Sequence, residues 1–251
     1  MANKDYLRRI GVLIPPSNVT CELEFPTYAP QGTRFHFNRL SRPGTAITRE
    51  SLLAMMRSTE RAAEDVACAR PEVIVYACTS GSFLDGPTKH RALAERIEAK
   101  TGIPAVTTST AVVEALQAVG ASTAFMVTPY PANINNHEVE FLEANGIRCP
   151  AHDSFLYPDS FDIRTTDESM VRDLVLKNRD KAKECGAVFI SCTNLRTMAR
   201  LAEMEAELGI PVISSNSATV WAGLSRMGID TSGIDAGRLF RTLPETGRQV
   251  A

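Results

Sequence analysis

The sequence lacks an excess of charge of either sign, and it lacks any long apolar run. Its 251 residues include 27 Lys and Arg against 29 Asp and Glu, which gives a net charge of −2. A nucleic-acid-binding protein usually carries a basic excess, so no nucleic-acid partner is expected. No apolar run approaches the ~18 residues that cross a bilayer, and the first residues form no apolar signal segment. We therefore expect a cytoplasmic protein with no membrane partner.

The motifs that hold nucleotides and metals are also missing. Neither G-x-x-x-x-G-K-[ST] nor G-x-G-x-x-G occurs, and the four histidines show no paired spacing. The six cysteines include no C-x-x-C pair, which disfavours a structural zinc site, and a disulfide framework is not expected without a signal segment. The sequence therefore predicts neither a metal nor a cofactor. By default, each cysteine is a small buried residue.

Short β-branched apolar runs alternate along the chain with longer segments whose apolar residues have helical spacing. Strands are predicted at 10–14, 73–77, 105–107, 123–128, 188–191 and 212–214. Helices are predicted at 50–69, 91–101, 111–119, 135–145, 170–184, 198–208 and 218–227. Because the strand runs are continuously apolar rather than alternating, the strands are expected to be buried on both faces. This pattern is typical of an α/β fold with parallel sheets.

An internal repeat divides the chain into two similar halves. A buried strand followed by Cys-Thr occurs twice, at Cys78 and at Cys192, and a Gly-Ile-Pro strand followed by a Ser/Thr cluster also occurs twice. These landmarks recur in the same order at an offset of roughly 110 residues. We predict two pseudo-symmetric Rossmann-like halves, residues 1–115 and 116–251, with a site between them. Whether the C-terminal segment returns to the first half is left open.

Four chemically useful side chains follow strands of the predicted sheets. Cys78 and Cys192 come directly after buried strands, and Asn18 and Tyr130 follow the proline-broken strands of the two halves. Ligands of parallel α/β sheets bind beyond the carboxyl ends of the strands. If the halves face each other, the two thiols approach one pocket from opposite sides. That arrangement suits chemistry on the two faces of a planar carbon.

The residues after each cysteine are candidates for holding a carboxylate. The turn after each cysteine leads toward a helix, so the backbone amides of Thr79, Ser80, Thr193 and Asn194 could bind an anion. The same positive helix end is expected to lower the pKa of a thiol and to favour the thiolate. The alternative is that both cysteines only pack beneath the strand ends. Their equivalent positions in a repeat favour a functional role. The other four cysteines, at positions 21, 68, 149 and 185, are interpreted as structural.

These residues resemble the aspartate/glutamate racemase superfamily. The resemblance rests on the two similar halves, each of which has a cysteine at the end of a strand. The two segments are Ala77-Cys-Thr-Ser-Gly and Ser191-Cys-Thr-Asn. Within that superfamily, Ile14-Pro-Pro-Ser-Asn-Val-Thr and Thr128-Pro-Tyr resemble the branch of maleate cis-trans isomerases and arylmalonate decarboxylases. The resemblance covers nearly the whole chain, from Arg9 to about Ile229.

The resemblance implies a cofactor-independent isomerase that acts on a small unsaturated dicarboxylate and forms a homodimer. Cys78 would add to the double bond, the adduct would rotate about a single bond, and Cys192 would serve as the opposing acid/base. Asn18 and Tyr130 match carboxylate-binding side chains of the family. In the Pro158-Asp-Ser loop the isomerases carry an Asn where this chain has Ser160, a shorter donor.

Four other functions are kept open. One is a related catabolic enzyme that acts on a small carboxylic acid, because family members of that kind also show Cys-Thr-Ser-Gly. A racemase of the aspartate/glutamate type would use the same cysteines as a two-base pair, although racemases carry Ala-Cys-Asn-Thr in the first half. Arylmalonate decarboxylases keep only the second-half cysteine, so Cys78 argues against that activity. A small-acid binding protein has no need of two opposed thiols.

Overall fold

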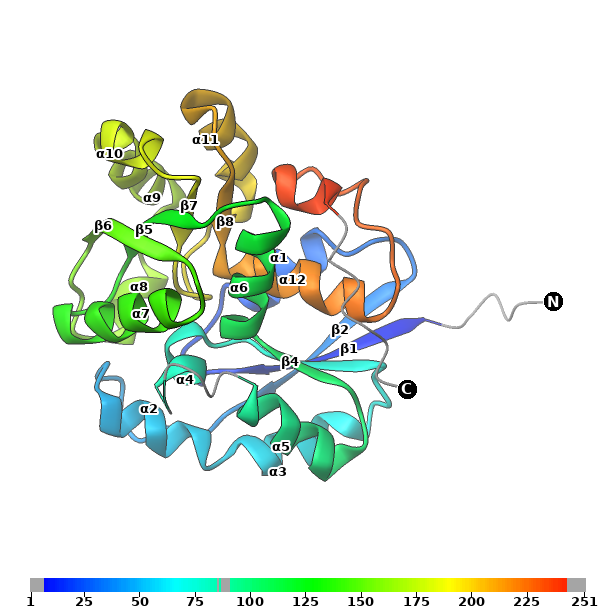
Figure 1. Ribbon diagram of the computed structural model, residues 1–251. Coiled ribbons are helices and arrows are strands. Elements are labelled where there is room, and N and C mark those ends of the chain that lie inside the picture. Colours follow the sequence, from blue (N-terminus) through cyan, green and yellow to red (C-terminus); the bar gives the residue numbers. More distant parts are fainter. Residues whose placement is uncertain (1–6, 85, 87–90, 243–251) are drawn as a thin grey trace.

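The computed structural model describes residues 7–84, 86 and 91–242 as two parallel sheets with flanking helices (Figure 1). The first residues, on which the expectation about a signal segment depends, lie outside this part. Each sheet is 4-stranded, and the strand orders are β2-β1-β3-β4 and β6-β5-β7-β8. The two orders are equivalent when the second half is numbered from its own first strand. The predicted fold class, two similar parallel α/β halves, is therefore confirmed.

The buried apolar runs of the sequence form the two central strands and one edge strand of each sheet. In the first sheet, β1, β3 and β4 follow the prediction closely, as β5, β7 and β8 do in the second. The strand bounds are β1 Arg8–Ile14, β2 Thr33–Arg39, β3 Val73–Tyr76, β4 Ala105–Thr107, β5 Thr123–Thr128, β6 Arg148–Ser154, β7 Ala187–Ile190 and β8 Val212–Ser214.

Two edge strands, β2 and β6, were not predicted. β2 pairs only with β1, and β6 pairs only with β5. Both strands contain charged and polar residues, and most of their residues are half-buried or exposed. β6 also contains Pro150, which lacks the backbone N–H that an inner strand would need. The edge strands β4 and β8 are buried throughout and were predicted, whereas β2 and β6 are only partly covered and have no continuous apolar run.

The helices agree with the prediction in place but differ at their ends. The predicted helices at 50–69 and 170–184 are each broken into two, and α6, α7 and α12 begin three residues earlier than expected. The short helices α1, α4 and α8 were not predicted. The bounds are α1 Cys21–Thr27, α2 Arg49–Met56, α3 Thr59–Ala67, α4 Thr79–Phe83, α5 Ala92–Thr101, α6 Thr108–Ala118, α7 Ala132–Ala144, α8 Ser160–Arg164, α9 Glu168–Lys177, α10 Arg179–Lys183, α11 Leu201–Leu208 and α12 Ser215–Arg226, with 3₁₀ turns η1 Met198–Arg200 and η2 Arg238–Arg241.

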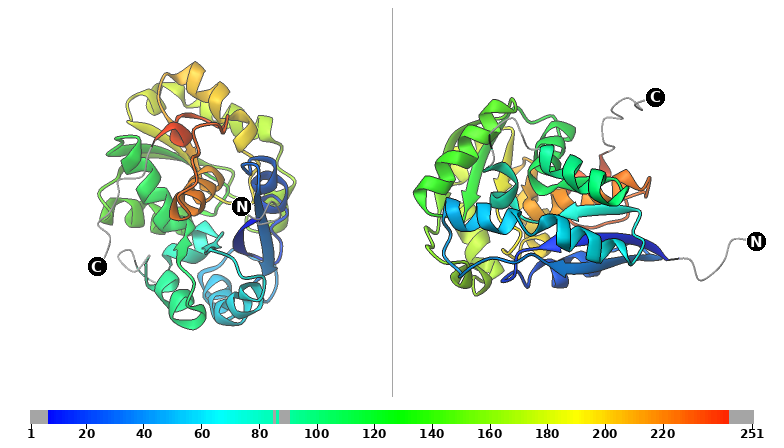
Figure 2. Two further views of the ribbon diagram at one scale, coloured as in Figure 1. Left: turned by 90° about the vertical axis from the view of Figure 1, so that its right-hand side faces the viewer. Right: turned by 90° about the horizontal axis from the view of Figure 1, so that it is seen from below.

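Helices α6 and α12 pack against each other in the middle of the molecule, between the two sheets (Figure 1, Figure 2). The Ser/Thr clusters before them supply the helix caps, because Thr107 accepts from the N–H of Thr110 and Ser214 accepts from that of Ser217. Helix α12 also contacts β3 of the first half, where a Cβ at Gly223 would lie 3.1 Å from Val75. The second half thus ends with a helix that lies against both sheets. The predicted boundary at residue 115 falls inside α6 and stays a prediction.

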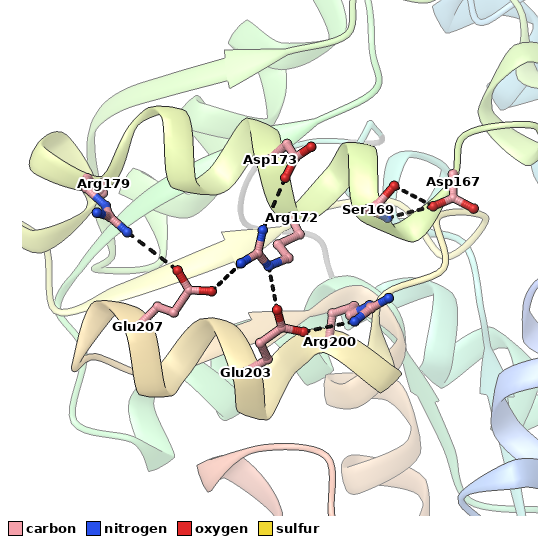
Figure 3. A network of polar contacts seen from close by, with 8 residues as sticks. All are labelled: Asp167, Ser169, Arg172, Asp173, Arg179, Arg200, Glu203 and Glu207. Carbon is pink, nitrogen blue, oxygen red and sulfur yellow. Dashed lines mark hydrogen bonds and ion pairs between the residues drawn. The ribbon is translucent and has the colours of Figure 1, made fainter.

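A network of ion pairs joins the outer helices of the second half (Figure 3). Arg172 of α9 contacts Glu203 at 2.6 Å and Glu207 at 2.5 Å, both on α11. Arg200 and Arg179 contact the same two carboxylates from η1 and α10. Exposed ion pairs stabilise a fold only a little, but the shared guanidinium fixes α9 against α11. In the described part of the chain, no helix is long and apolar enough to cross a bilayer.

Candidate active site

A cavity lies between the two sheets, and all nine residues predicted from the sequence line it. Residues of both halves contribute to its wall: Pro15, Ser17, Asn18, Arg42, Ile47, Leu52, Cys78, Thr79, Ser80, Tyr130, Ser160, Ile163, Cys192, Thr193 and Asn194. The chain therefore brings together side chains that are more than a hundred positions apart.

Cys78 lies between the end of β3 and the start of α4. Its thiol, 5 % exposed, accepts a hydrogen bond from the N–H of Gly81 at 3.4 Å and so caps the helix. The N–H groups of Thr79 and Ser80 lie in the first turn of α4, where no acceptor exists within a helix. The cysteine and these two amides therefore face the cavity as one group.

Cys192 follows β7 in a different backbone conformation. Its φ of 95° lies in the left-handed region, which residues other than glycine rarely adopt. Its thiol accepts a hydrogen bond from the N–H of Asn194 at 3.4 Å. A turn, rather than a helix, follows this cysteine. The expected turn that leads toward a helix is present here, but the next helical segment, η1, begins only at Met198. The two thiols share a pocket but not a local structure.

The expectation of lowered thiol pKa values is wrong for both cysteines. Burial raises the pKa of Cys78, and the Gly81 N–H, the positive charge of Arg42 and Ser80 oppose that rise without cancelling it. Burial also raises the pKa of Cys192 to about 12, against hydrogen bonds from Tyr130 and Asn194. Desolvation of the thiolate outweighs the favourable dipoles because both sulfurs are almost fully covered. The charge of Cys78 also raises the pKa of Cys192, since a second negative charge nearby is unfavourable.

Tyr130 links the end of β5 to the second thiol. Its hydroxyl hydrogen-bonds Cys192, and burial, with the negative charges of Cys192 and Glu138 nearby, raises the pKa of this phenol well above its ordinary value. The phenol therefore stays protonated and can donate to the sulfur when the thiolate forms. This side chain belongs to the cavity wall, not to a separate packed aromatic cluster.

Asn18 and Asn194 connect the two halves beside the cavity. Asn18 Nδ2 donates to Thr193 Oγ1 at 3.0 Å, while its Oδ1 accepts from the N–H groups of Thr20 and Cys21. Asn194 Oδ1 accepts from the N–H of Val19 at 3.0 Å. The Asn194 side chain thus joins the two halves, and the backbone N–H of Asn194 donates to Cys192 Sγ. Of the two asparagines, Asn18 is the better placed to offer a donor to a ligand.

Ser160 and Arg42 form one unit at the cavity wall, and sequence reasoning missed Arg42. The Nη2 of Arg42 donates to Ser160 Oγ at 2.6 Å, and Ser17 Oγ donates to the same oxygen at 3.1 Å. Arg42 follows the unpredicted strand β2, so no sequence signal placed it near Cys78. Four apolar residues, Pro15, Ile47, Leu52 and Ile163, complete the wall and were not predicted either.

The remaining cysteines are outside the cavity. Cys21, Cys149 and Cys185 are buried, as interpreted from the sequence, and Cys21 packs behind Thr193. Cys68 is exposed at the end of α3, so its default placement in the core is wrong. Within the described ranges, no three His, Cys, Asp or Glu side chains are grouped as metal ligands would be.

Comparison with known proteins identifies relatives along almost the entire chain. The maleate isomerase of Nocardia farcinica is 30% identical over 94% of this chain and 96% of its own length, and that of Geobacillus stearothermophilus is 27% identical over 92% and 96%. The fold is also similar to a mutant Nocardia farcinica maleate cis-trans isomerase with a covalently bound succinylcysteine intermediate. That structure has a TM-score of 0.87 and 27% identity, with 94% of this chain and 98% of the other covered.

A mutant arylmalonate decarboxylase in the liganded form is similar to a comparable extent, with a TM-score of 0.84, 25% identity and 93% and 98% of the two chains covered. The sequence model of the family described as arylmalonate decarboxylase matches residues 10–240, which include every residue of the cavity wall. Two parallel sheets, a cavity between them and this match lead to one conclusion: the chain belongs to the arylmalonate decarboxylase family.

Proposed function

We propose that the chain is a cofactor-independent cis-trans isomerase of a small unsaturated dicarboxylate, of the maleate-to-fumarate type. The observation that carries the proposal is the presence of two cysteine thiols, one from each half, in the wall of one cavity. The related maleate isomerases, and the succinylcysteine seen in one of them, support the same chemistry. Both thiols are present here, which favours the isomerase over the arylmalonate decarboxylase activity found elsewhere in the family.

The first step is the addition of Cys78 to the double bond. Cys78 gives its S–H proton to a carboxylate of the bound substrate as the Sγ–C bond forms. The π electrons move onto the neighbouring carbon and its carboxylate, and Cys192 transfers its proton to that carbon. The product is a succinyl thioether on Cys78 whose central C–C bond is single and can rotate. After this rotation the other proton of that carbon returns to Cys192, the Cys78 thiolate is expelled and takes its own proton back from the carboxylate, and the double bond is restored as trans. No atom is gained or lost, so the cycle needs no co-reactant.

The surrounding groups stabilise the negative charge that develops in this cycle. The N–H groups of Thr79 and Ser80, together with Asn18, are placed to hold one carboxylate and its enolate-like charge. Tyr130 donates to Cys192 and stabilises its thiolate form. Because burial raises both thiol pKa values, Cys78 loses its proton only as it attacks, with the substrate carboxylate as the acceptor, whereas Cys192 keeps its S–H proton as the acid.

The test is incubation of the protein with maleate in D2O, followed by NMR, for the wild type, Cys78→Ser and Cys192→Ser. Fumarate from the wild type and loss of turnover by several orders of magnitude in both variants are expected. In Cys192→Ser, a mass increase of one maleic acid on the peptide with Cys78 is expected, because elimination lacks its base. The exposed Cys68→Ser is the matched control and should behave as the wild type. Full activity of either pocket variant contradicts the two-thiol mechanism.

The same NMR experiment separates the alternatives. Deuterium at Cα of aspartate or glutamate, without fumarate from maleate, indicates the two-base racemase, and loss of CO2 from an arylmalonate indicates a decarboxylase. Binding of acids without any turnover indicates a binding protein. The homodimer and the cytoplasmic location belong to the proposal as well. Light scattering with size-exclusion chromatography tests the first, and cell fractionation tests the second.

A further inference from the structure

Arg42 stands in the cavity wall on the loop between β2 and α2, at residues 40–48. Its guanidinium makes hydrogen bonds only to neutral acceptors: Nε to the carbonyl of Gly44 at 3.3 Å, and Nη2 to the carbonyl of Thr45 at 3.1 Å and to Ser160 Oγ at 2.6 Å. A guanidinium has five N–H donors. The Nε donor and both Nη2 donors are thus engaged. Within the described residues, nothing accepts from the two donors of Nη1.

No carboxylate of the described chain forms an ion pair with Arg42, although one lies close by. The pKa of Asp159 is lowered mainly by hydrogen bonds from the Thr45 hydroxyl and the Phe161 N–H, and the charge of Arg42 adds to this shift. These two hydrogen bonds occupy the two oxygens of the carboxylate, and the one from Phe161 caps α8. The positive charge at the cavity wall therefore has no bonded counter-ion. A guanidinium with free donors in a partly buried site suits a carboxylate ligand, because the planar fork matches two carboxylate oxygens.

The positive charge of Arg42 acts on the thiol of Cys78. It opposes the rise in the pKa of Cys78, and both residues line the same wall. A four-carbon diacid bound through Cys78 carries its second carboxylate only a few bonds from the sulfur. The first carboxylate is opposite the Thr79 and Ser80 amides, and the remaining charged group at the wall is Arg42.

We propose that Arg42 is a specificity-determining residue that binds the second carboxylate of the substrate and thereby selects dicarboxylates over monocarboxylates. This proposal rests on the proposed function only for its substrate, a small diacid. Ser160 and the carbonyls of Gly44 and Thr45 hold the guanidinium in place, so that Nη1 is presented to the ligand. The apolar residues Ile47 and Leu52 line the same cavity.

The test compares the wild type with Arg42→Gln and Arg42→Lys on maleate and on its monoamide. With Arg42→Gln, kcat/KM for maleate should fall roughly 10- to 100-fold, while kcat/KM for the monoamide changes little, so that the preference for the diacid is lost. Arg42→Lys keeps the charge without the fork and should retain part of the preference. Arg57→Gln, at the exposed end of α2, is the matched control.

A second measurement is independent of turnover. Calorimetric titration with succinate and with butyrate should show that the wild type prefers succinate and that Arg42→Gln has lost most of this preference. An unchanged succinate preference in a folded Arg42→Gln overturns the proposal about Arg42, even if maleate is isomerised. A wild type that prefers succinate through Arg42 but does not convert maleate overturns the proposed reaction instead. Equal loss for diacid and monoamide shows a merely structural role and also overturns the Arg42 proposal.

Discussion

The hydroxyl of Thr79 donates a hydrogen bond to the hydroxyl of Ser215 at 2.8 Å. The same Ser215 oxygen accepts from the N–H of Cys192 at 3.0 Å. One buried hydroxyl at the start of α12 therefore joins the turn after the first cysteine to the backbone of the second. Cys192 has a left-handed φ, which is an unfavourable backbone conformation for a residue with a side chain. We therefore expect the hydrogen bond from its N–H to Ser215 to help hold the backbone in this conformation.

Replacement of Ser215 by Ala should impair both stability and catalysis. The buried N–H of Cys192 and the hydroxyl of Thr79 both lose their acceptor, and each unsatisfied group costs about 1–3 kcal/mol. We expect a lower free energy of unfolding in urea and a lower kcat on maleate. Ser232→Ala, at an exposed turn, removes a hydroxyl that bonds only Asp230 and should leave both values unchanged. If Ser215→Ala behaves like Ser232→Ala, the hydroxyl does not hold the two turns together.

Gly81 is in close contact with the first thiol. A Cβ at this position would lie 3.0 Å from Cys78 Sγ and 2.8 Å from the hydroxyl of Tyr76, both too close for ordinary contact. Gly81→Ala should therefore displace Cys78, slow its reaction with a thiol reagent and reduce kcat, with a stability loss of about 1–3 kcal/mol from overpacking. Gly233→Ala, where the Cβ would meet nothing within 4 Å, is the control. Unaltered thiol reactivity in Gly81→Ala would show that the site tolerates the methyl group.

The inner strands and the two cysteines could be predicted from the sequence because burial on both faces leaves an apolar run. Such runs end at the carboxyl edge of each sheet, where Cys78 and Cys192 lie. The edge strand β2 has no such run and was not predicted. Because Arg42 follows this strand, the apolar pattern did not place this charged residue in the cavity wall. The residues that the repeat placed together are those that occupy equivalent positions in the two halves.

The electrostatics of the site could not be predicted from local rules. A thiol at a helix start is expected to have a lowered pKa, but the depth at which both sulfurs are buried depends on how the halves close on each other. The asymmetry after Cys192, where a turn replaces the helix, is likewise a tertiary effect. Glu24 of α1 holds that turn, and no motif marks this long-range contact.

Glu24 is buried and accepts hydrogen bonds from the turn after Cys192. Its Oε1 accepts from the N–H groups of Thr197 at 2.6 Å and Met198 at 2.9 Å, and its Oε2 accepts from Asn216 at 2.5 Å. Glu24→Ala leaves these donors unpaired, so we expect a loss of about 3 kcal/mol or more in the free energy of unfolding. Glu22→Ala is the control on the same helix, because Glu22 forms only an exposed pair with Arg39, worth about 0–1 kcal/mol. Equal effects in the two variants would contradict the role assigned to Glu24.

Glu138 of α7 gives the protein a pH-dependent stability. Burial raises the pKa of this carboxyl to about 8, against the hydrogen bond that Ser191 donates to Oε1 at 2.6 Å. The folded state therefore keeps a proton that the unfolded state loses above the ordinary value of 4.5. This contribution to stability is complete below that ordinary value. It decreases by about 1 kcal/mol per pH unit as the pH rises toward about 8, because the folded state binds the extra proton.

Glu138→Gln removes that proton from the folded state and should flatten this dependence. Urea unfolding of the wild type and the variant between about pH 5 and about pH 8 gives the difference in free energy, in which the titration of all other groups cancels. We expect this difference to change with pH in favour of the variant as the pH rises. Glu140→Gln, on the exposed side of the same helix, should run parallel to the wild type. Parallel curves for Glu138→Gln as well would mean that Glu138 is ionised in the folded protein. In that case its charge would permanently oppose the thiolate of Cys192.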